Sequence, residues 1–188
     1  TMKKYYSLID KIYNKSNILE AFKRVKKNKG APGIDGETVQ NFESLLDEKI
    51  NEIHCELKNG DYKPNAVRRT YIKKDDGSER PLGIPTVKDR VVQQAVRNII
   101  EPIFEPDFHP SSYVYRPKRS CQMAVAKAEG FAKHWGLEYV VDMDLSKCFD
   151  TLNHELIIKS VNKRISDGKV LKLIEAFLQS GILEDGAF

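Results

Sequence analysis

The chain has 188 residues, of which 40% are hydrophobic and 31% charged, the composition of an ordinary globular protein. No apolar run approaches the ~20 residues of a membrane-spanning helix, and no secretory-type apolar stretch opens the chain, which argues against membrane and secreted classes. The net charge of +4 is uneven, because residues 1–30 hold nine Lys/Arg against two acidic residues, a balance of +7 that leaves −3 for the remainder. This basic segment suggests a polyanionic partner, with a solvated helix face as the alternative.

Two short helices are predicted at the start of the chain, over residues 4–13 and 17–29. Ser16 can cap the second helix and Gly30 can end it. Apolar residues at helical spacing give the second helix one buried face: Ile18, Ala21, Phe22 and Val25. Its other positions are mostly cationic and are the candidates for binding a polyanion: Lys23, Arg24, Lys26, Lys27 and Lys29.

The middle of the chain is predicted to hold a β-hairpin between helices. Residues 30–39 contain three Gly and one Pro and form a loop. A helix follows, with apolar residues three or four positions apart from Leu46 to Leu57, and Asn59-Gly60 stops it. The spacing then predicts strands over 66–74 and 79–85, joined by a turn at 75–78.

The second half of the chain alternates further predicted elements, so the fold class is α+β. They are a helix over 87–104, an extended piece over 113–117, a helix from the Ser120 cap to about Trp135, a strand over 138–145, and helices near 154–164 and 168–179.

Three cysteines, Cys55, Cys121 and Cys148, lie far apart and show no metal-binding or CxxC spacing. They indicate ordinary thiols in a reducing cytoplasm.

Three cations of the hairpin, Arg68, Lys74 and Arg80, lie on its strands or near its turn. Strand alternation places Arg68 and Lys74 on the same face if the strand is unbroken. Arg offers a bidentate fork and Lys a point charge, so the three could converge on a triphosphate. The alternative is that they are solvent-facing charges of a two-stranded ribbon.

Asp144 lies at the end of the apolar strand predicted over residues 138–145. A carboxylate there is unfavourable unless something pairs with it, and Mg²⁺ bound to carboxylate and phosphate oxygens is one solution. Asp142 and Asp144 point to the same face, and spacing alone does not choose between them. Asp150 is interpreted as the cap of the next helix. The alternative for Asp144 is likewise a cap or turn residue.

Four segments resemble successive blocks of bacterial group II intron reverse transcriptases (maturases), in the order of that family and over most of residues 29–150. They are KGAPGIDGETV, RRTYIKKDDGSERPLGIPTVKDRVVQQAV, FEPDFHPSSYVYRPKRS and VVDMDLSKCFD. The resemblance implies a right-hand polymerase fold with three parts. These are a basic N-terminal extension with the first loop block (1–36), fingers (37–136) and a partial palm (137–188).

The resemblance also implies roles for single residues. Arg68, Lys74 and Arg80 would contact the phosphates of the incoming dNTP. Asp144 would be the first metal-binding, catalytic aspartate of the palm, and the Leu145 carbonyl would bind the same Mg²⁺ ion.

Further roles implied by the resemblance concern the sugar and the template. Phe149 would press on the 2′ position of the sugar and so favour dNTPs, with packing in the core at the strand–helix junction as a second role. Tyr113, Tyr115, Arg116 and Arg119 would contact the template, with core packing as the alternative for the two tyrosines.

The implied function is RNA-directed DNA polymerase of a bacterial, cytoplasmic intron-encoded protein that binds intron RNA, assists splicing and makes cDNA during retrohoming. Its partners would be intron RNA, template RNA, a DNA primer and dNTP, with no membrane; a homodimer is left open. The sequence contains no Tyr-Ala-Asp-Asp and no Pro-Gln-Gly block. Residues 1–188 alone are therefore predicted not to polymerise. The alternatives are an RNA-binding splicing cofactor without polymerase activity, or a reverse transcriptase of another bacterial lineage.

Overall fold

The computed structural model describes residues 3–75, 77–145 and 148–183, except for the side chains of Phe149 and Asp150. By their contacts these residues form two compact units: Pro102–Leu152 is one, and the segments before and after it form the other. Helices and a small sheet are both present, so the α+β prediction is confirmed at this level. Within the described ranges, no helix is both long and apolar enough to cross a membrane. All three cysteines are free thiols.

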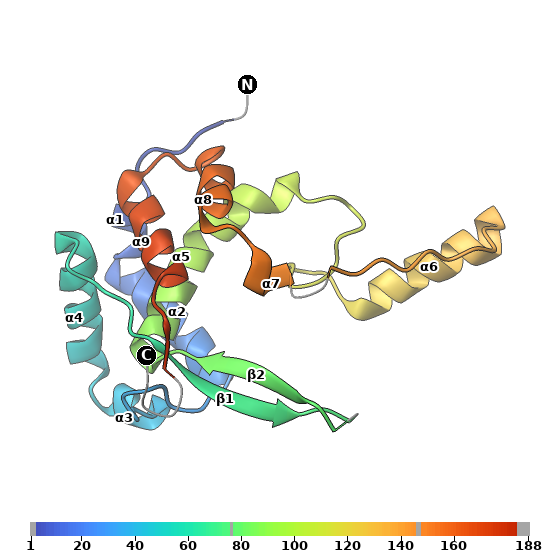
Figure 1. The fold of residues 1–188 in the computed structure, drawn as a ribbon. Coiled ribbons are helices and arrows are strands. Elements are labelled where there is room, and N and C mark those ends of the chain that lie inside the picture. The colour runs from blue at the N-terminus through green and yellow to red at the C-terminus, as the bar shows by residue number, and fades with distance from the viewer. Residues whose placement is uncertain (1–2, 76, 146–147, 184–188) are drawn as a thin grey trace. The chain divides into compact units, whose positions relative to one another are not determined.

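The first unit holds most of the helices (Figure 1), and their positions follow the predicted ones. Asn59-Gly60 ends one helix as predicted, because Gly60 adopts the left-handed conformation with φ at 87°. The helices of this unit are α1 (Ile9–Ile12), α2 (Lys15–Lys27), α3 (Val39–Ser44), α4 (Leu46–Asn59), most of α5 (Val87–Phe104), α8 (His154–Asn162) and α9 (Gly168–Leu178).

The N-terminus differs from its prediction because its backbone groups form hydrogen bonds with residues that are distant in sequence. Tyr5 pairs with Ile165 in an isolated parallel bridge, so the helix predicted over 4–13 is reduced to α1. The carboxylate of Asp167 accepts from the backbone N–H groups of Leu8 at 2.7 Å and Ile9 at 3.0 Å. The prediction that Ser16 caps α2 is wrong, since the Asn14 side chain is the cap and accepts from the Ser16 N–H at 3.0 Å.

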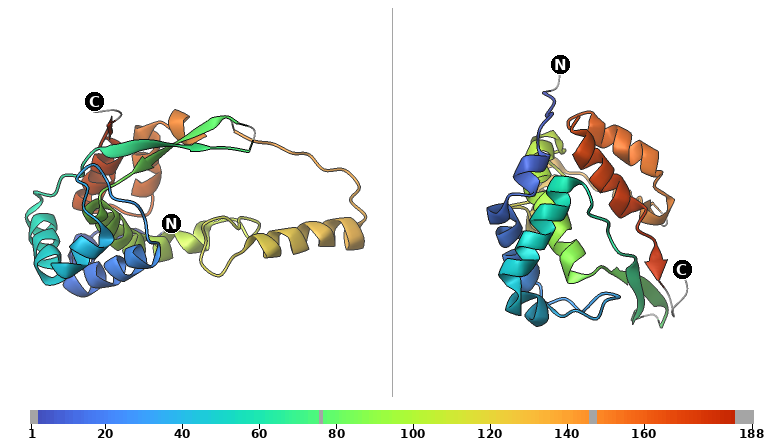
Figure 2. Two further views of the ribbon diagram at one scale, coloured as in Figure 1. Left: turned by 90° about the horizontal axis from the view of Figure 1, so that it is seen from below. Right: turned by 90° about the vertical axis from the view of Figure 1, so that its left-hand side faces the viewer.

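The basic helix α2 is packed into the core of the first unit. Its predicted apolar face is buried, and Phe22 stacks on Phe42 of α3 with ring centroids 5.3 Å apart. α2 contacts α4, and α8 contacts α9, as the two views in Figure 2 also show. α5 is the most buried helix, with four side chains that have no exposed surface: Val87, Val91, Val92 and Ala95.

The sheet of the first unit has three strands in the order β2-β1-β3. β1 (Val67–Lys73) and β2 (Glu79–Ile84) form the predicted antiparallel hairpin. The short β3 (Ile182–Leu183) pairs parallel to the start of β1 and was not predicted. Two apolar residues carry too little pattern for a sequence argument, and β3 depends on β1 for its hydrogen bonds.

The second unit contains the end of α5, a 3₁₀ turn (Glu105–Asp107), α6 (Cys121–Trp135) and α7 (Cys148–Thr151). Ser120 caps α6 as predicted, because its hydroxyl accepts from the Met123 N–H at 3.3 Å. The predicted strand over 138–145 is wrong, since no described residue pairs with this segment. Its apolar side chains are exposed, with Val140 at 93%. Strand composition alone does not make a strand, which also needs a hydrogen-bonding neighbour.

Candidate nucleotide and nucleic-acid site

The hairpin places two predicted phosphate-binding cations on one face. Arg68 lies opposite Ile84, and Arg80 lies opposite Ile72. Directly opposed residues share a face, so Arg68 and Arg80 do too, because Arg68 and Ile72 are four residues apart on β1. Lys74 follows the end of β1, where its N–H donates to the Ser78 carbonyl at 2.8 Å. Continued alternation gives it the same face.

The three cations are too far apart along the hairpin to converge on a single point. In register, Arg80 is about 7 Å along the ribbon from Lys74 and about 13 Å from Arg68, at roughly 3.3 Å per residue. Lys74 and Arg80 therefore form a pair near the turn. Arg68 lies at the base of the hairpin, where Leu183 of β3 pairs with it.

The charges of these three side chains are not neutralised by any described carboxylate. Lys74 and Arg80 are exposed, and Arg68 is half-buried. The Nε atoms of Arg68 and, on the other face, of Arg69 are buried and have no hydrogen-bond partner within the described residues. Because a buried donor without a partner is unfavourable by about 1–3 kcal/mol, a bound acceptor would stabilise it. The face of the hairpin that carries Arg68 and Arg80 is therefore suited to an anionic ligand.

The loop over residues 30–38 is held against the start of α5 by close backbone contacts. A Cβ atom at Gly33 would lie 2.6 Å from the Thr86 Cα atom, so only glycine fits. The Arg90 guanidinium donates to the Ala31 carbonyl at 2.9 Å. Burial lowers the pKa of Arg90, while the charge of Asp35 acts in the opposite direction. Arg90 therefore holds the loop, which the sequence did not indicate.

Asp89 is a buried anchor for the segment that leads into β1. Its carboxylate accepts from the Tyr62 hydroxyl at 2.6 Å, the Asn65 N–H at 3.1 Å and the Thr86 hydroxyl at 2.7 Å. Burial and the neighbouring Asp89 raise the pKa of Tyr62 well above its usual range, so its phenol stays protonated and donates. Because these three donors use the carboxylate, the adjacent Arg90 forms no ion pair with Asp89 within the described residues.

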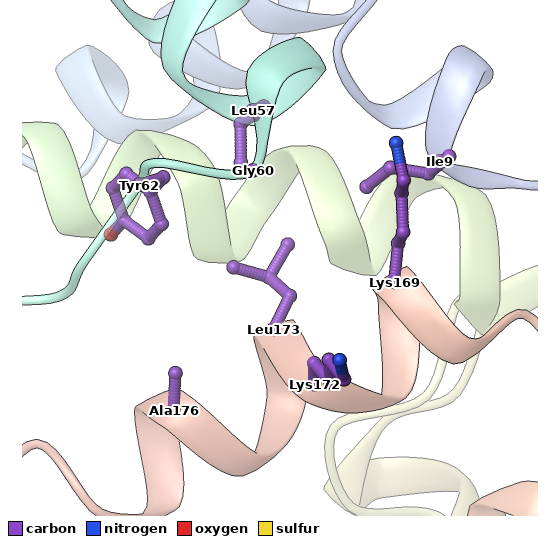
Figure 3. A pocket seen from close by; sticks show the side chains of 8 residues that line it. All are labelled: Ile9, Leu57, Gly60, Tyr62, Lys169, Lys172, Leu173 and Ala176. Carbon is purple, nitrogen blue, oxygen red and sulfur yellow. The ribbon is translucent and has the colours of Figure 1, made fainter.

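A cavity of about 250 Å³ lies between the end of α4 and α9 (Figure 3). Leu57 and Tyr62 form one wall, and Leu173 projects from α9 toward them. Lys169 and Lys172 stand at its margin. The cavity contains none of the predicted site residues.

Asp144 and Leu145 are both exposed, in the extended segment that precedes α7. The Asp144 carboxylate accepts from the Leu145 N–H at 2.9 Å. Within the described residues, no group of three or more His, Cys, Asp or Glu side chains could hold a metal ion. The oxygen donors of Asp144 and of the Leu145 carbonyl are of the type that Mg²⁺ prefers. They fit the ion in kind, but they would fill only a minority of its six positions.

The predicted sugar-contacting residue, Phe149, belongs to α7, and its side chain lies outside the described residues. The side chain of Asp150, interpreted as a helix cap, does so as well. The cap of the following helix, α8, is Asn153, whose side chain accepts from the Leu156 N–H at 3.2 Å.

The predicted template-binding segment is a loop held together by arginines. Arg116 forms a bidentate pair with Glu105, whose closest N–O distance is 2.7 Å, and it also donates to the carbonyls of His109 and Ser112. These hydrogen bonds lower the pKa of Glu105. The side chain of Arg116 is only 8% exposed. Its guanidinium therefore shapes the loop.

Of the other three residues of this segment, Tyr115 is exposed, whereas Tyr113 and Arg119 are half-buried. Arg119 lies 5.5 Å from the centroid of the Tyr113 ring and donates to the Pro110 carbonyl at 3.0 Å. Tyr115 is 87% exposed and has a left-handed backbone with φ at 56°. A left-handed non-glycine residue is unusual, and here it presents an aromatic ring to the outside.

The cations of α2 lie on its exposed side. Lys23 pairs with Glu20 at 3.4 Å, and Lys26 pairs with Glu43 of α3. Within the described part of the chain, Arg24, Lys27 and Lys29 have no carboxylate partner. α2 is thus a packed helix with one basic face, as its predicted buried positions indicated.

Comparison with known proteins identifies the family. The model of the reverse transcriptase (RNA-dependent DNA polymerase) family matches residues 72–187, which is more than half of the chain. The chain is a member of the reverse transcriptase family. The family resemblance found in the sequence is confirmed.

Curated relatives of this reverse transcriptase include proteins of group II introns. The chain is 41% identical over 168 residues to the group II intron-encoded protein LtrA of Lactococcus lactis subsp. cremoris. The aligned region covers 88% of the chain and 27% of LtrA. It is 38% identical to Protein YkfC of Escherichia coli (strain K12), covering 91% of the chain and 46% of that relative. It is 30% identical to the putative COX1/OXI3 intron 1 protein of Saccharomyces cerevisiae over 95% of the chain. The chain spans less than half the length of these relatives.

Some residues that shape the candidate site of this reverse transcriptase were not predicted. Asp89, Arg90 and the adjacent Gln93 and Gln94 stood in a recognised block without a role. One signal was present: Thr86 precedes Asp89 by three residues, the spacing of a helix-capping pair, and the Thr86 hydroxyl does accept from the Asp89 N–H at 3.1 Å. No local signal could show that Asp89 would also bind Tyr62.

Proposed function

We propose that this chain is the nucleotide-binding part of an RNA-directed DNA polymerase of the group II intron type. The protein would bind intron RNA, assist its splicing and copy RNA into cDNA during retrohoming. The proposal rests on family membership and on the similarity to LtrA over 88% of the chain. The observation that carries the chemistry is the hairpin face with Arg68 and Arg80, whose charges no described carboxylate neutralises.

The hairpin is proposed to bind the phosphates of the incoming dNTP. Lys74 and Arg80 would hold the outer phosphates near the turn, and the unsatisfied Nε of Arg68 would donate farther along the ribbon. Charged donors fixed before the reaction stabilise the charge that develops on the phosphates and orient the nucleotide for attack by the primer 3′-hydroxyl.

Asp144 and the Leu145 carbonyl are proposed as ligands of Mg²⁺ in the whole protein. When bound, the ion would lower the pKa of the attacking hydroxyl and stabilise the leaving pyrophosphate. Two such ions require more carboxylates than Asp144 and Asp142 provide, so residues 1–188 are proposed not to extend a primer. Primer extension by residues 1–188 alone would contradict this point.

The remaining assignments are proposals of the same kind. Residues 1–36 form the N-terminal extension with the first loop block, 37–136 the fingers, and 137–188 part of the palm. Phe149 would select against a 2′-hydroxyl. Tyr113, Tyr115 and Arg119 would contact the template, and Arg116 would keep their loop in shape.

The dNTP site can be tested by primer extension with the whole protein on an RNA template. Arg80→Ala is expected to raise the KM for dNTP by about 10-fold or more, because a charge-assisted contact to phosphate is lost. The matched control is Lys73→Ala, an equally exposed cation on the opposite face of the hairpin, which should leave KM within about twofold. Equal effects of the two substitutions would refute the assignment.

A second candidate function is RNA binding for splicing without polymerisation, favoured by the cations of α2. Replacing Lys23, Lys26 and Lys27 with Gln should weaken binding of intron RNA and flatten its salt dependence, since phosphate contacts release counterions. Affinity and salt slope that both stay unchanged would remove α2 from the RNA-binding surface. If the whole protein binds intron RNA but does not extend a primer, splicing assistance would be its only supported function.

A further inference from the structure

A cavity lined mostly by polar residues lies between the end of α2 and α5, apart from the hairpin. One of its lining residues, Arg90, also holds the loop over residues 30–38. The volume of the cavity is about 250 Å³. We call it the α2–α5 pocket and define it by its lining residues: Val25, Asn28, Arg90, Gln93, Gln94 and Arg97. All belong to the first compact unit.

The spacing of the two helices at this pocket is set by neighbouring hydrogen bonds. Near the start of α2, the Asn17 amide donates to the Ala95 carbonyl at 3.1 Å and accepts from Asn98 at 3.0 Å. Beyond the end of α2, Arg90 donates to the Ala31 carbonyl at 2.9 Å. The pocket lies between these two links, so its walls are fixed without a ligand.

The chemical groups in the pocket suit a nucleobase. Asn28 and Gln93 provide both donors and acceptors, as the edges of unpaired bases require, while the Gln94 amide N–H already donates to Asn98 at 2.8 Å. Arg90 and Arg97 add planar guanidinium groups, which bind the Ala31 carbonyl and the Glu101 carboxylate. The amides of Asn28 and Gln93 have no side-chain hydrogen-bond partner among the described residues. The lining contains no carboxylate, and Val25, only 6% exposed, adds an apolar wall. A phosphate group accepts hydrogen bonds only, so it would leave the acceptor oxygens of these amides unused.

The size and surroundings of the pocket narrow the ligand further. Its volume lies just below the roughly 300–1,000 Å³ of sites for drug-sized ligands, which suits a single base. Arg24 lies one helical turn before Asn28 on the same side of α2, and Lys27 and Lys29 are close in sequence. These exposed cations can bind the phosphates on either side of a base. Single-stranded RNA offers this combination, since its bases can turn away from the helix.

We propose that the α2–α5 pocket binds one unpaired base of the RNA that the protein recognises, with Gln93 as a specificity-determining residue. This inference deepens the RNA binding of the proposed function and rests on it. Because the pocket is separate from the hairpin cations, it should act on RNA affinity and not on the KM for dNTP.

The test measures binding of the 188-residue chain to fluorescent RNAs by anisotropy. The probes are poly-A, poly-C and poly-U strands of about 12 nucleotides, within the usual range of single-strand sites, and an abasic ribose-phosphate strand of equal length. The wild-type chain is expected to bind at least one base-bearing strand about 10-fold more tightly than the abasic strand. Gln93→Leu and the length-conserving Gln93→Met should both lose this preference and bind the abasic strand as before.

The control is Gln179→Leu, a change of the same type at the exposed end of α9, which should retain the full preference. Thermal unfolding of each variant shows that it is folded. If the wild-type chain binds base-bearing and abasic strands equally well, the pocket does not bind a base. If the preference survives both Gln93 substitutions, Gln93 does not determine it. Either result would overturn the proposed base-binding role and leave RNA binding in place. Absence of binding to all four strands would overturn the RNA-binding function itself, and the inference with it.

Discussion

Helices α5 and α6 begin with the same kind of cap but differ in how much of their surface is buried. Each starts behind a hydroxyl cap: Thr86 accepts from the Asp89 N–H, and Ser120 accepts from the Met123 N–H. α5 buries a full apolar face, whereas α6 has no buried residue. The comparison teaches that local capping decides where a helix begins, while its tertiary neighbours decide what it buries and how much it stabilises the fold. The same contrast holds for the two compact units that contain them.

The largest expected difference between the units concerns aromatic side chains. Phe22 is 2% exposed and Trp135 is 72% exposed. Phe22→Ala should lower the free energy of unfolding by roughly 3–5 kcal/mol, because it leaves a cavity beside Phe42. Trp135→Ala should change it by no more than about 0.5 kcal/mol. Urea unfolding monitored by circular dichroism measures both, and comparable losses would remove the contrast.

Aspartates provide the second comparison. Asp89→Asn should lower the free energy of unfolding by roughly 2–4 kcal/mol, because Tyr62, Asn65 and Thr86 share one acceptor that the amide replaces poorly. Asp144→Asn should stay within about 0.5 kcal/mol, since its carboxylate is exposed. In the whole protein the order should invert for activity, with Asp144→Asn abolishing primer extension. A stable and active Asp89→Asn protein would speak against the buried anchor.

Glycines should respond with opposite signs in the two units. Gly33→Ala should lower the free energy of unfolding by about 1–3 kcal/mol, because the new methyl group would meet the backbone of Thr86. Gly130→Ala, inside α6, should raise it by up to about 1 kcal/mol, since the nearest atom, on His134, is 4.0 Å away and alanine favours helix. Chemical denaturation of the two variants decides the signs. Stabilisation by Gly33→Ala would show that the loop does not pack as described.

The smallest expected effect is a dependence of stability on pH through Asp167. Burial tends to raise the pKa of this carboxyl, but four backbone N–H groups outweigh it and lower the pKa below 3.8. A lowered folded pKa means that the stabilisation is complete above the unfolded value, near 3.8, and is lost as the pH falls through the folded value. Unfolding measured between about pH 6 and about pH 2 should show a loss of stability that Asp167→Asn lacks. An identical acid slope in both proteins would exclude Asp167 as its source.

Much of the fold was predictable because most elements carry local signals. The α4 stop at Gly60, the β1–β2 hairpin and the Ser120 cap of α6 depend on residues close in sequence. The strand over 138–145 was the main error, since its composition is that of a strand but no described residue pairs with it. The pairing of Tyr5 with Ile165 and the addition of β3 to β1 were not predictable for a related reason: their partners are more than a hundred residues away.

For the candidate site, residue types and their local spacing were enough to predict the family, the hairpin and the kinds of side chains that face a ligand. Long-range packing was needed to show that Asp89 is a buried anchor, that Arg116 is bound by Glu105, and that Gln93 lines a pocket with Asn28. The physical reason is that hydrogen bonds and burial depend on which distant segments meet. That choice is made by the packing of the whole unit.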